Sequence, residues 1–366
     1  MKKIILACPG GVTTPNVWSG TPLLLYTEMT KNSQIDVIPM DISYNPPSWK
    51  RILMNWYSMF FYLEGFRNFF TNREWSESIA QNISDTPADA ILYLAEYFYS
   101  KKMPSQMKMF AYVDVERYYW STYTLRKFKP LYRLHYYYYK KNTKKVLFHL
   151  DKIFTMNDWC GRELVKRYGI DQSKIVKVGF GVNCKFLEEP KTYDNNLLLI
   201  ILRKGREKYK GLKLLLNAFP MIREKYPHAR LAVVGTDYGA NIDGVECYYN
   251  QPRETTLKLL KEATLYVMPS LSEPNGVTYL EAMANKTPIV GLNRFAYPEF
   301  AGHANERGFI VNTASPKEVA TTVIDALSDK DRLETMGLNG YEFVKANYSW
   351  DVVVNKIERI ILNQIQ

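Results

Sequence analysis

Short apolar segments alternate with amphipathic segments of helical periodicity along the whole chain, and this alternation restricts the fold more than any other feature. A strand, a helix and another strand in succession usually join as parallel neighbours, so the pattern predicts an α/β protein with parallel sheets. Expected strands cover residues 4–7, 36–39, 90–94, 109–113, 152–156 and 175–178 in the first half, and 197–202, 230–234, 263–269, 288–292 and 308–311 in the second.

The chain is long enough, at 366 residues, for two domains with separate cores. The link between them is expected in a polar stretch without periodicity at 186–195. We therefore place a first α/β domain at 1–186 and a second at 187–347. The segment 350–365 is strongly amphipathic and is expected to return to the first domain, which then also includes 348–366. Other clear helices are expected from residue 22 and at 159–168, 212–226, 316–328 and 331–347.

The cellular location is predicted from what the sequence lacks. The first apolar run stops after five residues at Pro9, which is too short for a signal peptide and favours a buried strand. No segment approaches the roughly 18 apolar residues of a spanning helix. The cysteines show no metal-type or redox-type spacing and are expected to be buried thiols in a reducing cytoplasm. They are Cys8, Cys160, Cys184 and Cys247.

The net charge of +11 is concentrated in one segment, 101–145. It holds twelve Lys and Arg residues against Asp114 and Glu116, together with twelve aromatic residues. The segment 49–70 is also rich in basic and aromatic side chains. Such a surface suits an anionic membrane, which would make the protein peripheral on the inner face of the membrane. A solvated basic face over a tyrosine-rich core is the structural alternative, and no nucleic-acid partner is expected.

Two carboxylates, Glu273 and Glu281, stand seven residues apart in S-L-S-E-P-N-G-V-T-Y-L-E-A-M-A. A strand precedes them, and a helix of about two turns is expected to begin near Thr278, with Glu281 in its first turn. The backbone N–H groups of Gly276, Val277 and Thr278 would then point into the loop crevice, where an anion can bind. A phosphate between two carboxylates is the layout of a nucleotide-sugar site, so the motif points to glycosyl transfer.

Further motifs accompany this pair. They are the basic glycine loop at 203–211, V-V-G at 233–235, Pro298-Glu299 and G-F-I-V at 308–311, with weaker matches at Ser19-Gly20, 155–159 and 181–183. Together they resemble glycosyltransferase family 4, the retaining enzymes of GT-B fold, over most of the second half. The resemblance implies two Rossmann-like domains whose parallel sheets face each other across a cleft, with the donor on the second domain and the acceptor on the first.

The resemblance also implies roles on the donor side. Glu281 would accept hydrogen bonds from the ribose hydroxyls, and Glu273 would orient the donor sugar and stabilise positive charge at its anomeric carbon. Arg206 and Lys210 would neutralise the leaving diphosphate, although Arg203, Lys204 and Lys208 compete for that task. The remaining donor-binding residues, several acting through backbone groups, would be Ser19, Gly20, Gly235, Asn275, Gly276, Val277 and Thr278.

The acceptor side departs from the family pattern. The strand 110–114 ends in Asp114, where the family often has a histidine facing the acceptor. Asp114 could orient the acceptor hydroxyl or act as a base, because it would lie at the carboxyl end of a parallel strand. A helix cap for the residues that follow is an equally good interpretation.

The predicted function is therefore a retaining, metal-independent hexosyltransferase without a cofactor. It would move a sugar from a nucleoside diphosphate to a glycan, lipid-linked glycan or protein glycan. UDP, GDP and ADP remain open as the donor nucleotide. The alternatives are a nucleotide-sugar epimerase and a catalytically silent GT-B binding module. A dinucleotide oxidoreductase is disfavoured, because P-G-G-V-T-T-P follows the first strand in place of G-x-G-x-x-G.

Overall fold

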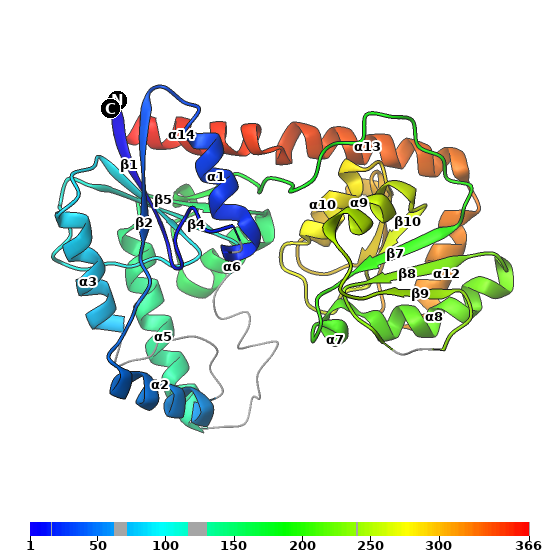
Figure 1. The fold of residues 1–366 in the computed structure, drawn as a ribbon, viewed down its shortest axis with the longest axis horizontal. Coiled ribbons are helices and arrows are strands. Elements are labelled where there is room, and N and C mark those ends of the chain that lie inside the picture. The colour runs from blue at the N-terminus through cyan, green and yellow to red at the C-terminus, as the bar shows by residue number, and fades with distance from the viewer. Residues whose placement is uncertain (16, 62–71, 116–129, 239–240, 366) are drawn as a thin grey trace. The chain divides into compact units, whose positions relative to one another are not determined.

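The computed structural model describes residues 1–15, 17–61, 72–115, 130–238 and 241–365. The chain divides into two compact units, Met1–Gly179 with Trp350–Gln366, and Phe180–Ser349 (Figure 1). This division falls after Gly179, whereas the sequence places the link at 186–195. Residues 180–195 thus belong to the second unit, where the backbone N–H of Leu187 donates to the carbonyl of Ala284 at 3.0 Å.

The first unit is built on a six-stranded parallel sheet with the order β2-β1-β3-β4-β5-β6. Its central strands are buried on both faces, as expected of a parallel sheet covered by helices. In register, Leu6 pairs with Leu92, and Leu92 with Phe110. The strands are β1 (Lys2–Cys8), β2 (Ile35–Asp41), β3 (Ala90–Leu94), β4 (Lys108–Val113), β5 (Lys152–Thr155) and β6 (Ile175–Lys177).

Helices cover this sheet, and the last helix of the chain is one of them. Figure 1 shows α14 (Trp350–Gln364) beside α1 (Thr21–Met29), and the two helices are in contact. Asn32, just after α1, donates to the carboxylate of Glu358 on α14 at 2.7 Å. The expected return of the carboxyl-terminal helix to the first unit is what the structure shows. The other helices are α2 (Ser48–Phe61), α3 (Asn72–Ser84), α5 (Pro130–His149) and α6 (Asp158–Tyr168).

The second unit has its own six-stranded parallel sheet, with the order β12-β11-β10-β7-β8-β9. The sequence did not predict β9, because this edge strand is only partly buried and shows no continuous apolar run. It carries Cys247, which is exposed, so the expectation of buried cysteines is wrong at this position. The strands are β7 (Leu197–Ile201), β8 (Arg230–Val234), β9 (Val245–Tyr248), β10 (Leu265–Val267), β11 (Ile289–Leu292) and β12 (Gly308–Val311).

Helices pack in contacting pairs around the second sheet, notably α8 with α12 and α10 with α13. The helices are α7 (Glu207–Lys210), α8 (Leu212–Lys225), α9 (Arg253–Glu262), α10 (Val277–Ala284), α11 (Tyr297–Ala301), α12 (Pro316–Leu327) and α13 (Lys330–Tyr348). Within the described ranges, no helix combines the length and the apolar character that crossing a bilayer requires.

Candidate functional site

The second sheet has a topological switch point between β7 and β10. After β7 the chain adds β8 and β9 on one side, and it then returns to place β10, β11 and β12 on the other. The loops after β7 and β10 therefore leave the carboxyl ends of neighbouring strands in opposite directions. Ligands of open α/β sheets bind at switch points of this kind.

The two loops are fastened together by backbone contacts. Gly211 adopts a left-handed conformation (φ 77°), and a Cβ at this position would overlap the carbonyl oxygen of Pro269. The carbonyl of Tyr209 accepts hydrogen bonds from Leu271 N at 2.8 Å, Ser272 N at 3.2 Å and Ser270 Oγ at 2.8 Å. The basic loop is therefore held at a fixed position beside the loop that carries Glu273.

Lys210 and Glu273 meet at this junction as an ion pair, with 21% and 14% of their side chains exposed. The other carboxylate oxygen of Glu273 accepts the backbone N–H of Gly276 at 2.8 Å. Burial lowers the pKa of Lys210 to about 8, and the nearby positive charges of Arg203 and Arg206 act in the same direction. The amide of Gly276, expected to be open for an anion, thus has an acidic partner within its own loop.

Helix α10 begins directly after this loop. Gly276 caps the helix in a left-handed conformation (φ 66°), and a Cβ there would lie 2.6 Å from the ring of Tyr279. Val277 and Thr278 form the first turn of α10, and the hydroxyl of Thr278 accepts a hydrogen bond from Tyr266 at 2.7 Å. Asn275 lies in the loop before the cap, between Glu273 and Gly276.

Glu281 lies in the second turn of α10, not in the first as predicted, and only 3% of the residue is exposed. Its carboxylate forms an ion pair with Arg253, the first residue of α9. Its backbone carbonyl accepts a hydrogen bond from Asn285 Nδ2 at 2.8 Å. Glu281 is therefore a buried carboxylate in the middle of α10, paired with the first residue of α9.

The rest of the basic loop is partly exposed. Arg206 lies at the start of α7, and its backbone N–H donates to the backbone carbonyl of Arg203 at 2.9 Å. Glu207 accepts from Gly205 N at 2.9 Å and Thr236 Oγ1 at 2.8 Å. Burial would raise the pKa of Glu207, but these hydrogen bonds outweigh it and the pKa is lowered. Glu207 thus shapes the turn between β7 and α7.

Gly235, predicted to bind the donor, has a packing role in the structure. Its φ is 91°, and a Cβ would overlap the carbonyl oxygen of Leu202. Its N–H donates to the carbonyl of Tyr248 at 2.9 Å. A side chain at this position would push the end of β8 away from the loop that follows β7.

The first sheet has a corresponding switch point between β1 and β3. The loop after β1 ends in three consecutive left-handed residues, Trp18 (φ 42°), Ser19 (φ 60°) and Gly20 (φ 82°), immediately before α1. This conformation is rare for Trp and is held in place by its surroundings. The Trp18 ring lies edge-on to Tyr112, with 5.8 Å between the ring centroids.

Trp18 also fixes Asp114 at the end of β4, because its Nε1–H donates to Asp114 Oδ2 at 3.2 Å. Burial raises the pKa of Asp114 to about 6, although the hydrogen bond from Trp18 acts to lower it. Asp114 is therefore placed at the strand end, as predicted. The helix-cap alternative concerns residues from 116 onwards, which lie outside the described part of the chain.

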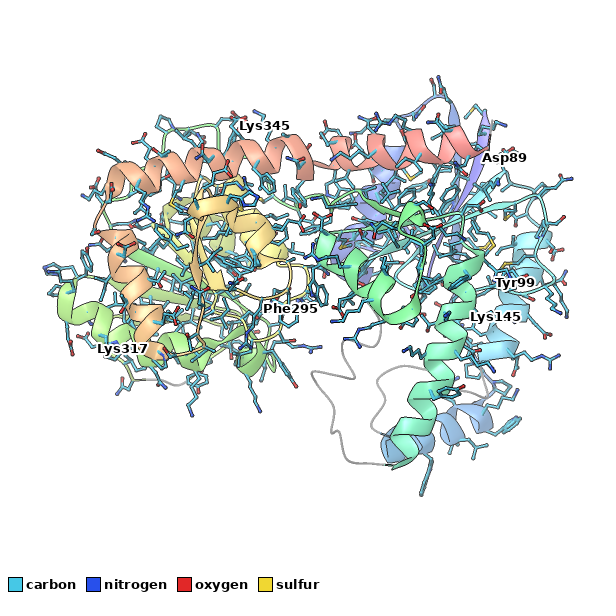
Figure 2. The ribbon with its side chains drawn as sticks, turned by 180° about the vertical axis from the view of Figure 1, so that it is seen from behind. Asp89, Tyr99, Lys145, Phe295, Lys317 and Lys345 are labelled. Carbon is cyan, nitrogen blue, oxygen red and sulfur yellow. The ribbon has the colours of Figure 1, made fainter. Side chains whose placement is uncertain are left out.

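The two basic aromatic segments are described in part, since 62–70 and 116–129 lie outside the described residues. On α2, a row of exposed side chains follows the spacing of one helix face: Trp49 (60%), Ile52 (57%), Leu53 (61%) and Trp56 (57%). On α5, Lys145 lies 5.8 Å from the ring centroid of Tyr99, which stacks on His149 (Figure 2). Part of the basic aromatic composition thus stabilises the first unit itself.

Sequence reasoning missed Trp18 and Arg253. Arg253 is 28 residues before Glu281, and no local spacing connects them. Trp18 directly precedes the predicted Ser19, but its contact with Asp114 spans 96 residues. The described residues contain no group of three or more His, Cys, Asp or Glu side chains that could hold a metal ion. Metal independence nevertheless stays a prediction, because a nucleotide can bring its own ion.

Comparison with known proteins gives one family match, which lies within the second unit, and several relatives. Residues 186–343 match the family model described as glycosyl transferases group 1. An uncharacterized glycosyltransferase of Methanocaldococcus jannaschii is 33% identical over 171 residues, which cover 43% of each chain. A GDP-mannose-dependent alpha-(1-6)-phosphatidylinositol monomannoside mannosyltransferase of Mycobacterium tuberculosis is 29% identical over 172 residues, covering 40% of this chain and 43% of that one. The chain thus spans less than half the length of these relatives.

Solved structures resemble the whole chain. A sucrose-phosphate synthase from Thermosynechococcus elongatus superposes with a TM-score of 0.70 at 14% identity and covers 99% of both chains. At this identity the likeness shows the fold, which is GT-B with two Rossmann-like α/β units. The match of residues 186–343 adds a sequence similarity to glycosyl transferases within the second unit.

Proposed function

We propose that the protein is a retaining glycosyltransferase that moves a sugar from a nucleoside diphosphate to a hydroxyl group of a glycan, lipid-linked glycan or protein glycan. The observation that carries the proposal is the arrangement at the β7/β10 switch point. There Lys210, Glu273 and the amide of Gly276 meet, and buried Glu281 lies in the adjoining helix. A cation, helix amides and two carboxylates are the groups that a nucleotide sugar needs.

The diphosphate would bind to Lys210, Arg206 and the first turn of α10. Lys210 is mostly buried, so its charge acts through a low local dielectric and is more effective than an exposed lysine. Backbone amides of Gly276, Val277 and Thr278 add donors with a fixed direction, supported by the helix dipole. As the bond between sugar and diphosphate breaks, these groups stabilise the charge that develops on the leaving oxygen.

Glu273 would contact the donor sugar, and Glu281 would contact the ribose. When the diphosphate takes over Lys210, the carboxylate of Glu273 becomes available for the sugar hydroxyls and for positive charge at the anomeric carbon. Glu281 accepts hydrogen bonds only, which suits the two ribose hydroxyls. We propose that the two fixed cations replace a metal ion, and that the departing diphosphate oxygen takes the acceptor proton on the same face of the sugar.

The first unit would bind the acceptor, with Asp114 near its hydroxyl. Asp114 lies at the end of β4, where the indole N–H of Trp18 holds its carboxylate. We propose in addition that α2 rests on an anionic membrane surface. Trp49, Ile52 and Leu53 expose apolar area on one face, Arg51 is exposed beside them, and the chain carries a net charge of +11. This would make the protein cytoplasmic and peripheral on the inner face.

Nucleotide binding tests the donor site directly. UDP, GDP and ADP are titrated calorimetrically, first without metal and with EDTA, then with Mg²⁺. We expect one of them to bind, and Lys210→Ala to weaken its binding strongly. Lys208→Ala is the matched control, because Lys208 lies in the same loop but is exposed. The proposal fails if none of the three nucleotides binds, and metal independence fails if binding and turnover both require Mg²⁺.

A second experiment separates transfer from its alternatives. The sugar nucleotide of the base that binds is incubated with the protein, first alone and then with hydroxyl acceptors such as short glycosides. Transfer yields a new glycoside of retained anomeric configuration and free nucleoside diphosphate. An epimerised donor without acceptor would support the epimerase, and binding without any conversion in either arm would support the silent module.

A further inference from the structure

Glu281 is unusual because a carboxylate lies almost completely out of solvent. The residue is 3% exposed, whereas an isolated ionised carboxylate at such a depth would be strongly destabilised. A charged partner that donates a hydrogen bond offsets this cost. The structure provides one in Arg253, whose Nη2 donates to Oε1 of Glu281.

Arg253 reaches Glu281 from another element. It is the first residue of α9, directly after Pro252, and α9 contacts α10. The same Nη2 also lies 3.5 Å from the backbone carbonyl of Asn183. The guanidinium is thereby directed by two acceptors, while 46% of the Arg253 side chain remains exposed. Arg253 is thus a partly exposed cation that pairs with a buried carboxylate.

The contact leaves Glu281 with acceptor capacity. A carboxylate offers about four lone-pair positions, and Arg253 uses Oε1. The pair therefore holds the carboxylate of Glu281 in one orientation and leaves other lone-pair positions open. Asn285 supports the same turn of α10 by donating to the backbone carbonyl of Glu281. The side chain of Glu281 depends on Arg253, whereas its backbone is held independently.

We propose that Arg253 is the positioning residue that makes Glu281 selective for ribose. This inference rests on the proposed function, in which Glu281 accepts the ribose hydroxyls of the donor nucleotide. Arg253 fixes the direction of the carboxylate, so that both hydroxyls find an acceptor at once. Without Arg253 the carboxylate loses this fixed direction, so a ribose hydroxyl binds little better than the hydrogen atom that replaces it in the 2′-deoxy form.

The test compares each nucleoside diphosphate with its 2′-deoxy form. UDP, GDP and ADP and their 2′-deoxy counterparts are titrated calorimetrically against wild type, Arg253→Gln and Arg253→Lys. Arg230→Gln is the matched control, since Arg230 and Glu246 form a half-exposed pair at 3.7 Å in the same unit. For the nucleotide that binds, we expect wild type to prefer the ribose form by about tenfold or more.

Arg253→Gln should reduce this preference to within about threefold, mainly by weakening the ribose form, while the 2′-deoxy form binds nearly as in wild type. Arg253→Lys should keep an intermediate preference, because it retains the charge but not the planar fork. A full preference in both Arg253 variants, or none in wild type, overturns the inference. Failure of wild type to bind any of the three nucleotides instead overturns the proposed function. Should Arg253→Gln not fold, the Lys variant decides.

Discussion

The ammonium group of Lys210 contacts one carboxylate oxygen of Glu273, while the other oxygen of Glu273 accepts the amide of Gly276. A cation and a helix amide, the two kinds of group suited to a phosphate, are thus both engaged by one carboxylate of the same chain. A phosphate that binds at this position has to replace the carboxylate of Glu273 as the partner of both groups.

Replacing Glu273 by Gln should separate nucleotide binding from turnover. The substitution removes the negative charge that competes for Lys210, so a nucleoside diphosphate without sugar should bind about threefold or more tightly. Transfer should fall by about a hundredfold, because charge at the anomeric carbon loses its partner. Calorimetry and initial rates measure the two effects, with Glu246→Gln as control. Unchanged or weaker nucleotide binding would contradict the exchange.

Replacing Lys210 by Ala should weaken nucleotide binding and slow transfer, by about a hundredfold in kcat, since leaving-group charge loses a buried cation. Lys208→Ala in the same loop should stay within about twofold of wild type. Steady-state kinetics with the identified sugar nucleotide give both values. Equal losses in the two variants would show that the loop supplies only a diffuse positive potential.

Nucleotide affinity should fall with rising pH. The pKa of Lys210 in the free protein is about 8, so below this pH the side chain is already charged and ready for an anion. Above it, binding must include uptake of a proton, and affinity should drop by up to about tenfold per pH unit. Calorimetry between pH 6 and 10 tests this with wild type, Lys210→Arg and Lys208→Ala. Lys210→Arg should keep the nucleotide affinity constant to a higher pH than wild type. An identical pH profile for this variant would show that Lys210 is not the titrating group.

Asp114→Asn should stabilise the protein at neutral pH. The folded-state pKa of Asp114 is raised to about 6, because the buried site favours the neutral carboxyl. The stability that this neutral form contributes to the folded protein is complete below the unfolded pKa of 3.8, and it is lost as the pH rises through 6. The Asn variant should therefore melt at a higher temperature than wild type at pH 7 and at a similar one near pH 4. Trp18→Phe should enlarge the effect, because the bond from Trp18 lowers this pKa. A lower melting temperature for Asp114→Asn than for wild type at pH 7 would contradict the raised pKa of Asp114.

Binding to anionic vesicles should depend on the exposed face of α2. We expect the protein to sediment with vesicles containing phosphatidylglycerol, less so with pure phosphatidylcholine, and less at high salt. The double variant Ile52→Glu, Leu53→Glu should abolish sedimentation. Leu338→Glu on α13, where 46% of the leucine is exposed, is the matched control. If both variants bind like wild type, α2 is not the docking face.

The sequence predicted the strands of both sheets where apolar runs are buried on two faces. Ala90–Leu94, for example, is expected and observed with the same bounds. It missed β9, whose half-buried residues lack such a run, and the single-turn helix α7. In the site, Glu273 and Lys210 could be named from local motifs. Their ion pair could not, because it depends on how the chain crosses between β7 and β10.

Long-range contacts explain the other differences. Nothing near Arg253 in the sequence indicates a partner 28 residues away, and the buried state of Glu281 follows from the packing of α9 on α10. The first-turn position predicted for Glu281 is wrong because Gly276, in a left-handed conformation, starts the helix at Val277. Local chemistry thus indicated which residues matter, while topology decided which of them meet.

The internal pairing of Lys210 has a consequence for the ions that surround the protein in a cell. A free orthophosphate arriving at this loop competes with a carboxylate that is covalently tethered and never diffuses away. Under the proposed function, a nucleotide sugar would have further points of attachment and would displace the tethered carboxylate more readily than a lone inorganic anion. The ion pair between Lys210 and Glu273 would in this way reduce inhibition by orthophosphate when no nucleotide sugar is bound.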